Sequence, residues 1–124
     1  MFYLAFENSK CNDYVTEKFY NALDIDIVPI VMGGANYSAI APAGSYIDVN
    51  DFSSPQQLAK ELKRLSNARE EYLNYYKWKA ETKVLRGSEA RAQSGCNLCK
   101  ALHEAKPAKT YEDLGAWWSG GGNC

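Results

Sequence analysis

The sequence lacks an excess of charge of either sign. Its 124 residues include 14 lysines and arginines and 15 aspartates and glutamates, which gives a formal net charge of −1 at pH 7. Proteins that bind DNA or RNA through the phosphates carry a basic patch or stripe, so no nucleic-acid partner is expected. The hydrophobic fraction of 46% and the charged fraction of 23% are those of ordinary soluble domains, which excludes disordered and fibrous classes.

Long apolar runs are missing as well. A membrane-spanning helix needs about 20 consecutive apolar residues, and the longest candidate, from Ile25 to Met32, is interrupted by Asp26 and Pro29. Met1 leads directly into a strand-like run, without the basic flank and cleavage site of a secretory leader. A chain that opens in this way is expected to be part of a longer protein.

Two common ligand signatures are absent or weak. The G-x-G-x-x-G fingerprint does not occur, so a dinucleotide cofactor is not indicated. The spacing D-x-D occurs at Asp24-Ile25-Asp26, but these residues fall between a predicted helix and a predicted strand. His103 is the single histidine, for which a surface or capping role is favoured over catalysis. No metal site is therefore predicted.

Cysteine is scarce but even in number. Cys96 and Cys99 form a C-x-x-C pair, a spacing shared by short-loop disulfides, redox-active thiols and half zinc sites. Zinc is disfavoured because His103 and the other thiols lack a standard finger spacing. An even count suits an oxidising compartment, where three connectivities are open. We favour one disulfide between Cys96 and Cys99 and another between Cys11 and Cys124, with free thiols as an alternative.

What the sequence does contain is an alternation of strand-like and helix-like segments. Apolar, partly β-branched runs at Phe2–Phe6, 27–32 and 45–49 predict three strands. A helix from Asn12 or Asp13 to about Leu23 is predicted between the first two strands, and one helical turn at 36–41 between the last two. This order predicts an α/β fold with a parallel sheet, as in one βαβαβ half of a Rossmann-like domain.

The first predicted helix is amphipathic. Its core stripe is expected to consist of Val15, Phe19, Ala22 and Leu23, which share one helix face. On the opposite side lie Tyr14, Glu17, Lys18 and Asn21. Those four residues form either a solvated face or a ligand-facing surface, and spacing alone does not decide between the two.

The loop after the second strand carries two features. Gly33 and Gly34 allow a sharp turn or a close approach of the backbone to a ligand, and loop geometry is the commoner reason for such a pair. Asn36-Tyr37-Ser38 is an N-glycosylation sequon and makes Asn36 a candidate glycosylation site, although such sequons are often unoccupied.

The remaining sequence divides into three parts. Residues 1–80 are expected to form one domain, whose last helices begin at the capping box Ser54 to Gln57 and run on through an aromatic stripe over 68–79. Residues 81–95 are charged and predict a linker or an exposed helix. Residues 96–124 are expected to form a cysteine-containing helical tail that packs back on the domain through its two adjacent tryptophans.

The opening of the chain resembles a known signature. Phe2–Lys18 follows FYLxFENS…DYxTEK, the donor-sugar motif of the α1,3-fucosyltransferases, glycosyltransferase family 10, nearly letter for letter. Further words of that family follow in order: Asn21-Ala22-Leu23, Val28-Pro29-Ile30-Val31, Asn36-Tyr37, Ser45-Tyr46-Ile47, Asp51-Phe52, Pro55, Lys77-Trp78-Lys79 and Tyr111-Glu112-Asp113-Leu114. Ala5, Cys11, the Cys-Asn-Leu-Cys form and the terminal Trp-Trp…Cys look most like the core α1,3-fucosyltransferases of invertebrates and plants.

The resemblance implies the C-terminal, donor-binding half of a GT-B glycosyltransferase, in which two Rossmann-like domains face each other. It implies transfer of fucose from GDP-fucose in α1,3 linkage to the N-acetylglucosamine of glycoprotein N-glycans. Proteins of this kind lie on the lumenal side of the Golgi apparatus as single-pass type II membrane proteins, so an anchor is expected in the region that precedes this chain. No cofactor is required, and stimulation by a divalent ion is left open.

The same resemblance places seven residues at the GDP-fucose site: Glu7, Asn8, Tyr14, Val15, Thr16, Glu17 and Lys18. Lys18 is expected to hold the diphosphate, and Glu17 to accept hydrogen bonds from the ribose hydroxyls. Asn8 and Tyr14 would line phosphate and ribose, with Glu7 near the fucose. Backbone amides around Val15 and Thr16 would add phosphate contacts at the helix start.

The chemistry also requires groups that this chain does not match. Deprotonation of the acceptor hydroxyl needs a general base, and in the family that carboxylate and an arginine on the diphosphate lie outside the matched segment. No catalytic residue is therefore assigned, and the chain alone is expected to be inactive. Two alternatives stay open: a fragment that binds GDP or GDP-fucose without turnover, and a flavodoxin-like structural or regulatory domain.

Overall fold

Three parallel strands form the centre of the structure, a computed structural model that describes residues 1–104 and 107–120. The strands β1 (Phe2–Phe6), β2 (Val28–Met32) and β3 (Ile47–Asp48) lie in the order β1-β2-β3. Phe2 pairs with Val28 at one end of β1 and Phe6 pairs with Met32 at the other. The predicted α/β fold with a parallel sheet is therefore confirmed.

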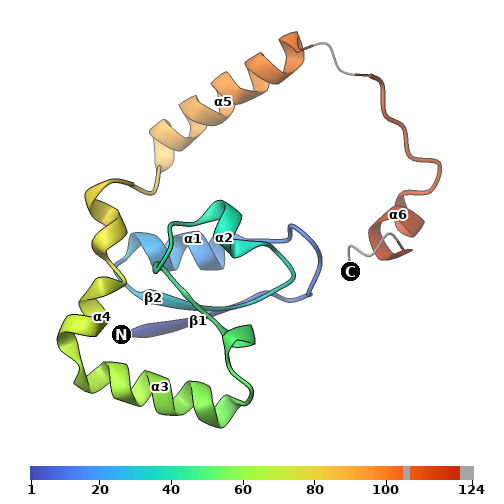
Figure 1. Cartoon of the computed structure of the whole chain (residues 1–124). Coiled ribbons are helices and arrows are strands. Elements are labelled where there is room, and N and C mark those ends of the chain that lie inside the picture. The colour runs from blue at the N-terminus through green and yellow to red at the C-terminus, as the bar shows by residue number, and fades with distance from the viewer. Residues whose placement is uncertain (105–106, 121–124) are drawn as a thin grey trace.

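Helices cover both faces of this sheet (Figure 1). The short helices α1 (Glu17–Asp24) and α2 (Tyr37–Ile40) lie on one face, and α3 (Pro55–Asn67) lies on the other. The remaining elements are the 3₁₀ turns η1 (Val49–Asp51) and η2 (Lys77–Ala80) and the helices α4 (Arg69–Asn74), α5 (Gly87–His103) and α6 (Leu114–Gly120). Each parallel pair of strands is joined by a crossover that contains a helix, as parallel pairing requires.

The central strand β2 divides the core into two clusters. Side chains of successive strand residues point to opposite faces, so Val31 faces α1 while Val28 and Ile30 face α3. The α1-side cluster contains the buried side chains Ala5, Phe19, Leu23, Val31 and Tyr37. The α3-side cluster contains Val28, Ile30, Ile47 and Leu65. At the edge of the sheet, the β1 side chains Tyr3 and Leu4 are exposed.

The first helix begins later than predicted. Asn12 or Asp13 was the expected N-cap, but α1 starts at Glu17 with Thr16 as the N-cap. Asp13 has a left-handed backbone, φ 59°, which Asp tolerates better than most residues but which a right-handed helix does not contain. Tyr14 therefore lies in a turn, where its amide donates to the carbonyl of Cys11 at 3.3 Å.

The second half of the domain follows the prediction in part. Ser54 caps α3, accepting a hydrogen bond from the amide of Gln57 at 3.3 Å, with Pro55 in the first turn. The helix predicted over 68–79 is instead interrupted between α4 and η2. Its aromatic stripe does pack as predicted: Tyr72, Tyr75 and Tyr76 contact the α3-side cluster, and Trp78 contacts the α1-side cluster.

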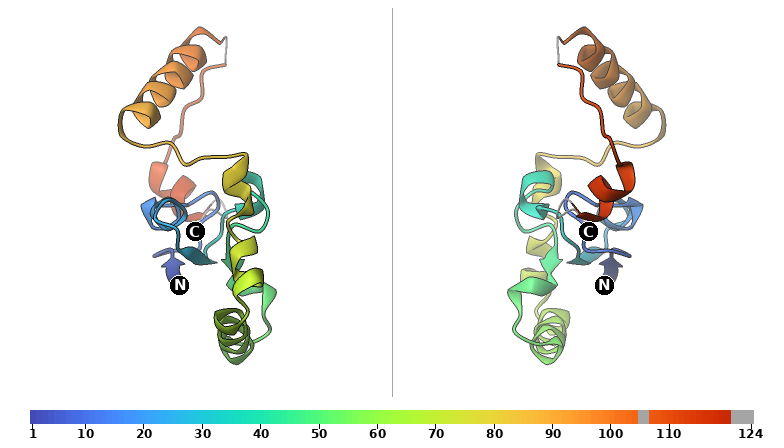
Figure 2. Two further views of the ribbon diagram at one scale, coloured as in Figure 1. Left: turned by 90° about the vertical axis from the view of Figure 1, so that its left-hand side faces the viewer. Right: turned by 90° about the vertical axis from the view of Figure 1, so that its right-hand side faces the viewer.

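The described part of the C-terminal tail differs from the packed tail that the sequence predicts. α5 and α6 bury no side chain, and both views of Figure 2 show α5 projecting beyond the sheet and its helices. Trp117 and Trp118 remain 39% and 49% exposed. α5 has no continuous apolar stripe to place against a core, and it runs without a break across the boundary predicted at residue 95.

The predicted disulfide between Cys96 and Cys99 is wrong. Both residues are exposed free thiols within α5. A regular helix holds the Cβ atoms of residues three apart at about 5–6 Å, whereas a disulfide needs about 3.5–4.5 Å. Cys11, in contrast, is buried and disulfide-bonded. Its predicted partner, Cys124, lies outside the described residues.

Gly33 and Gly34 allow close packing within the protein. A Cβ on Gly34 would lie 2.6 Å from the carbonyl oxygens of Lys10 and Cys11. The backbone of the loop after β2 can therefore approach the backbone of the loop after β1 only because residue 34 has no side chain.

Replacing Gly34 by Ala is expected to lower the free energy of unfolding by about 1–3 kcal/mol, because backbone atoms must move to admit the methyl group. The measurement is urea unfolding. Gly95→Ala in α5 is the control, since a Cβ there meets nothing within 4 Å and should raise helix stability by up to about 1 kcal/mol. Equal destabilisation by the two substitutions would contradict this account of Gly34.

Candidate functional site

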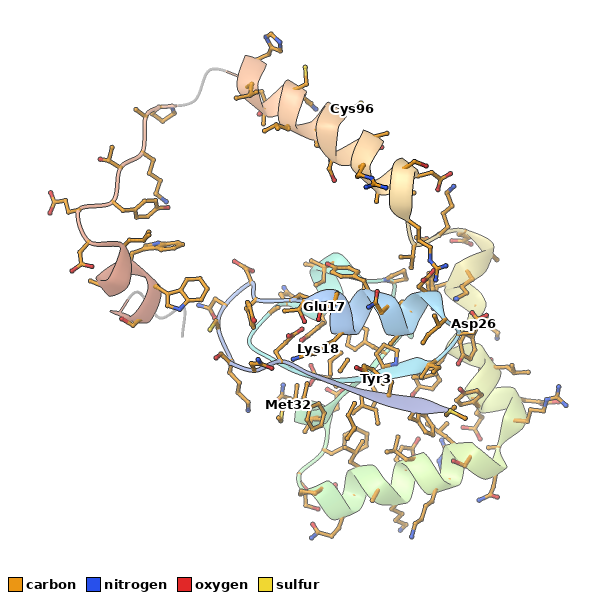
Figure 3. All side chains as sticks on the ribbon, turned by 180° about the vertical axis from the view of Figure 1, so that it is seen from behind. Tyr3, Glu17, Lys18, Asp26, Met32 and Cys96 are labelled. Carbon is orange, nitrogen blue, oxygen red and sulfur yellow. The ribbon has the colours of Figure 1, made fainter. Side chains whose placement is uncertain are left out.

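The candidate site lies where the carboxyl ends of β1 and β2 meet. Because the two strands are parallel, the loop after β1 and the loop after β2 leave the sheet at the same edge. The amino end of α1 lies at this edge, and Figure 3 shows Glu17 and Lys18 there, at the opposite end of α1 from Asp26. Ligands of open α/β sheets bind in this position, and a helix amino terminus there favours anions.

The centre of the site is the buried carboxylate of Glu7, whose side chain is 0% exposed. Its Oε1 accepts a hydrogen bond from the amide of Thr16 at 2.9 Å, and its Oε2 accepts one from the hydroxyl of Thr16 at 2.8 Å. The carboxylate thus caps the first turn of α1 from outside the helix, which places a negative charge at the positive end of the helix dipole.

Lys18 is the cation of the site. Its Nζ donates hydrogen bonds to Asn8 Oδ1 at 2.7 Å and to the carbonyl of Phe6 at 3.0 Å, and it lies 3.9 Å from Glu7 Oε2. The side chain keeps 27% of its surface exposed. Lys18 therefore combines a fixed position at the end of β1 with access from solvent.

Tyr37 is the third polar group beside Glu7. The residue is only 3% exposed, and its hydroxyl has no hydrogen-bond partner among the described protein groups. Its ring packs against Phe19, with centroids 5.3 Å apart. Burial, together with the nearby charge of Glu7, raises the pKa of Tyr37 to about 12, so the hydroxyl keeps its proton at physiological pH.

The structure brings together four of the seven predicted site residues. Hydrogen bonds join Glu7 to Thr16 and Lys18 to Asn8, and the 3.9 Å ion pair between Lys18 and Glu7 connects the two pairs. Glu17 is exposed at the start of α1, and Tyr14 is half-buried in the preceding turn. Val15 is half-buried against the α1-side cluster.

Two expectations change at this point. The amide of Thr16, expected to contact phosphate, already donates to Glu7. Glu7, expected near the fucose, is enclosed by its protein partners; a carboxylate in this position supports Thr16 and Lys18, and its direct contact with a sugar stays a prediction.

Sequence reasoning missed Tyr37 as a member of the site. The residue stands in the predicted helical turn 36–41 and in the family word Asn36-Tyr37, but neither feature indicates that its hydroxyl lies near Glu7. The missing signal was Gly33: a Cβ there would lie 2.5 Å from the Tyr37 hydroxyl. Residue 33 must therefore be glycine for the Tyr37 hydroxyl to fit in this position.

The D-x-D spacing lies at the other end of α1 and is occupied by protein cations. Asp24 pairs with Arg86, and Asp26 pairs with Lys79. Within residues 1–104 and 107–120, no group of three or more His, Cys, Asp or Glu side chains is arranged to hold a metal ion. None of the described helices is both long and apolar enough to cross a bilayer.

The candidate glycosylation site is accessible. Asn36 is exposed before α2, and its Oδ1 accepts a hydrogen bond from the hydroxyl of Ser38 at 2.7 Å. The side chain lies in the loop after β2, on the same edge of the sheet as Lys18. Attachment of an N-glycan to Asn36 stays a prediction.

A parallel sheet that holds a cation and a helix amino terminus at its carboxyl edge defines a Rossmann-like domain with a site suited to an anionic ligand. Comparison with known sequences narrows this class. Residues 1–117 match the family model described as Glycosyltransferase family 10 (fucosyltransferase) C-term. The chain belongs to this family, which confirms the resemblance of its opening run.

Individual relatives agree with this placement. Glycoprotein 3-alpha-L-fucosyltransferase A of Drosophila melanogaster is 44% identical over 129 residues, which cover 99% of this chain and 25% of the relative. Alpha-(1,3)-fucosyltransferase fut-6 of Caenorhabditis elegans is 38% identical, over 94% of this chain and 31% of the relative. The 4-galactosyl-N-acetylglucosaminide 3-alpha-L-fucosyltransferase 9 of Mus musculus is 42% identical, over 90% of this chain and 32% of the relative. The chain thus spans about a quarter to a third of their length.

Replacing Thr16 by Val tests the support of Glu7. The variant keeps the shape of the side chain and the hydrogen bond from the backbone amide of residue 16 to Glu7. It loses the 2.8 Å hydrogen bond from the Thr16 hydroxyl to the buried carboxylate. The free energy of unfolding should fall by about 1.5–3 kcal/mol, as measured by urea unfolding. Thr82→Val, at an exposed threonine, is the control and should change it little. A Thr16→Val variant as stable as this control would show that Glu7 does not depend on the hydroxyl.

Proposed function

We propose that this chain supplies the donor-binding part of an enzyme that transfers fucose from GDP-fucose in α1,3 linkage to the N-acetylglucosamine of glycoprotein N-glycans. Family membership supports the fucosyl donor, and similarity to the Drosophila glycoprotein fucosyltransferase supports the glycoprotein acceptor. The observation that carries the proposal is the position of Lys18, a partly exposed cation beside a helix amino terminus at the carboxyl edge of the sheet.

The charge of Lys18 suits the departure of a diphosphate. When the bond between fucose C1 and the phosphate oxygen breaks, its electron pair stays with GDP and negative charge grows on the diphosphate. A fixed cation at this position stabilises that charge without reorganising. The amino end of α1 adds a second, weaker source of positive potential. Since protein groups can supply this charge, we propose no required metal cofactor, and stimulation by a divalent ion stays open.

Glu17 is suited to the nucleoside half of the donor. It is exposed in the first turn of α1, next to Lys18 in the sequence. A carboxylate has two oxygens that accept hydrogen bonds, which matches the two adjacent hydroxyls of a ribose. Asn8 and Tyr14 lie in the loop between β1 and α1, from which they would line the phosphate and ribose. The proposal therefore assigns Glu17 and Lys18 to binding and not to proton transfer.

The remaining parts of the reaction belong to the rest of the protein. A general base must deprotonate the attacking acceptor hydroxyl, and displacement from the face opposite GDP inverts the configuration at C1. We place that base, the acceptor site and a membrane anchor outside these 124 residues, in a Golgi protein whose catalytic part faces the lumen. An oxidising lumen is consistent with the disulfide at Cys11.

Lys18→Ala in the full-length protein tests the donor site. We expect kcat/KM for GDP-fucose to fall at least about 100-fold, because the leaving diphosphate loses its fixed cation. The measurement is GDP release in the presence of a glycopeptide acceptor. Lys60→Ala, at an exposed position of α3 on the opposite face of the sheet, is the control and should leave the rate unchanged. Equal rates for the Lys18 variant and the wild-type protein would refute the assignment.

The 124-residue chain alone is expected to transfer no fucose and to bind GDP-fucose weakly, because it provides one side of the site and no general base. Transfer can be followed with radiolabelled GDP-fucose and a glycopeptide acceptor, with the full-length protein as the positive control. Measurable transfer by the isolated chain would place the base within these residues.

A further inference from the structure

The hydroxyl of Tyr37 is buried without a hydrogen-bond partner among the described protein groups. A buried hydroxyl without a hydrogen bond destabilises the folded state, and such groups are uncommon in proteins. The Tyr37 ring is held by Phe19 and Tyr46, with centroids 5.3 and 5.7 Å away. The hydroxyl is therefore kept in a costly position by the packing of its ring, next to groups that bind Lys18.

Glu7 lies beside this hydroxyl. The Tyr37 hydroxyl and Glu7 Cγ lie 2.5 and 3.4 Å from the same point, the position that a Cβ on Gly33 would occupy. A carboxylate offers about four acceptor positions, and the bonds from Thr16 use two of them. Glu7 thus has room for one more donor, and Tyr37 is a donor without an acceptor.

Lys18 connects this pair to the ligand. An ammonium has three N–H donors. In the structure, two of the Lys18 donors bond Asn8 and the carbonyl of Phe6, while the charge lies 3.9 Å from Glu7. One donor is left for a ligand, and a diphosphate that takes a second one turns Lys18 away from one of these partners. As it does so, the buried carboxylate of Glu7 loses its nearest cation, which is unfavourable unless another group compensates.

We propose that the Tyr37 hydroxyl replaces Lys18 as the partner of Glu7 when Lys18 turns to the donor diphosphate. Tyr37 is then a positioning residue: it touches no donor atom but lowers the free energy of the state in which Lys18 faces the ligand. The exchange moves hydrogen bonds only and breaks no covalent bond. It rests on the proposed function, because it requires a donor whose phosphates attract Lys18.

Tyr37→Phe in the full-length protein tests the exchange. The variant removes only the hydroxyl, so the KM for GDP-fucose and the dissociation constant for GDP should rise about 10-fold. In this proposal Lys18 turns to the diphosphate before the bond between fucose C1 and the phosphate oxygen breaks. The substitution therefore affects binding, and kcat should stay within a factor of two. The melting temperature of the free protein should be unchanged or higher, because the hydroxyl has no partner there.

Two comparisons separate this role from a structural one. Tyr46→Phe removes the hydroxyl of a neighbouring ring in the same cluster and should leave KM unchanged. In a Lys18→Ala background, Glu7 depends on Tyr37 even without ligand. Tyr37→Phe should there lower the melting temperature of the free protein by several degrees, although it does not do so in the wild-type background.

Each result decides the matter. An unchanged KM in Tyr37→Phe, or a rise in KM accompanied by a lower melting temperature in the wild-type background, would overturn the exchange. Equal effects of Tyr37→Phe with and without Lys18 would also overturn it. If the wild-type protein fails to bind GDP, both the proposed function and the exchange that rests on it are wrong. If the wild-type protein binds GDP and Tyr37→Phe binds it equally well, the exchange alone fails.

Discussion

The burial of one carboxylate, that of Glu7, determines the local structure at the carboxyl edge of the sheet. A buried charge is tolerated only when it is paired and hydrogen-bonded. Glu7 meets that requirement with the amide and hydroxyl of Thr16 and the nearby ammonium of Lys18. These contacts fix the point at which the loop after β1 becomes α1. They also hold the cation where the strand ends, so the start of the helix and the location of the site have the same cause.

The two ends of α1 are electrostatically different. At the amino end, Lys18 keeps part of its surface open to solvent and bonds neutral oxygens of Asn8 and Phe6. At the carboxyl end, the acidic side chains Asp24 and Asp26 are neutralised by Arg86 and Lys79. An anionic ligand is therefore favoured at one end, while the other end serves to attach the chain that follows η2. The end of α1 that favours an anion is thus the end at the carboxyl edge of the sheet.

The fold was more predictable than the site. The order of the strands and of the helices between them and the Ser54 cap depend on short-range patterns and appear in the structure. Of the predicted core stripe, Phe19, Ala22 and Leu23 are buried in α1, whereas Val15 precedes the helix and is half-buried. The sequence did not predict the late start of α1, because a left-handed Asp13 and the tertiary bond from Glu7 to Thr16 outweigh local capping preferences. In the described part of the tail, Trp117 and Trp118 are partly exposed. Apolar residues in a sequence indicate burial without indicating against which surface.

Within the site, the family signature identified the right loop but not the arrangement within it. Glu7, Asn8, Thr16 and Lys18 are near in sequence and meet in space. Tyr37 comes from another crossover, so its approach to Glu7 depends on the register of β1 against β2. That register is visible only once the strands are paired.

The position of β1 at the edge of the sheet links this site to the sheet's growth. Glu7 and Asn8 directly follow β1, which is paired with β2 on one side while Tyr3 and Leu4 stay exposed. A strand that hydrogen-bonds along the open side of β1 would lie next to the strand that leads into Glu7. The amide of Glu7 bonds the carbonyl of Met32 at 3.1 Å, so the pairing of β1 with β2 sets the position of the carboxylate. The open edge of the sheet and the candidate site thus lie on one continuous segment of the chain.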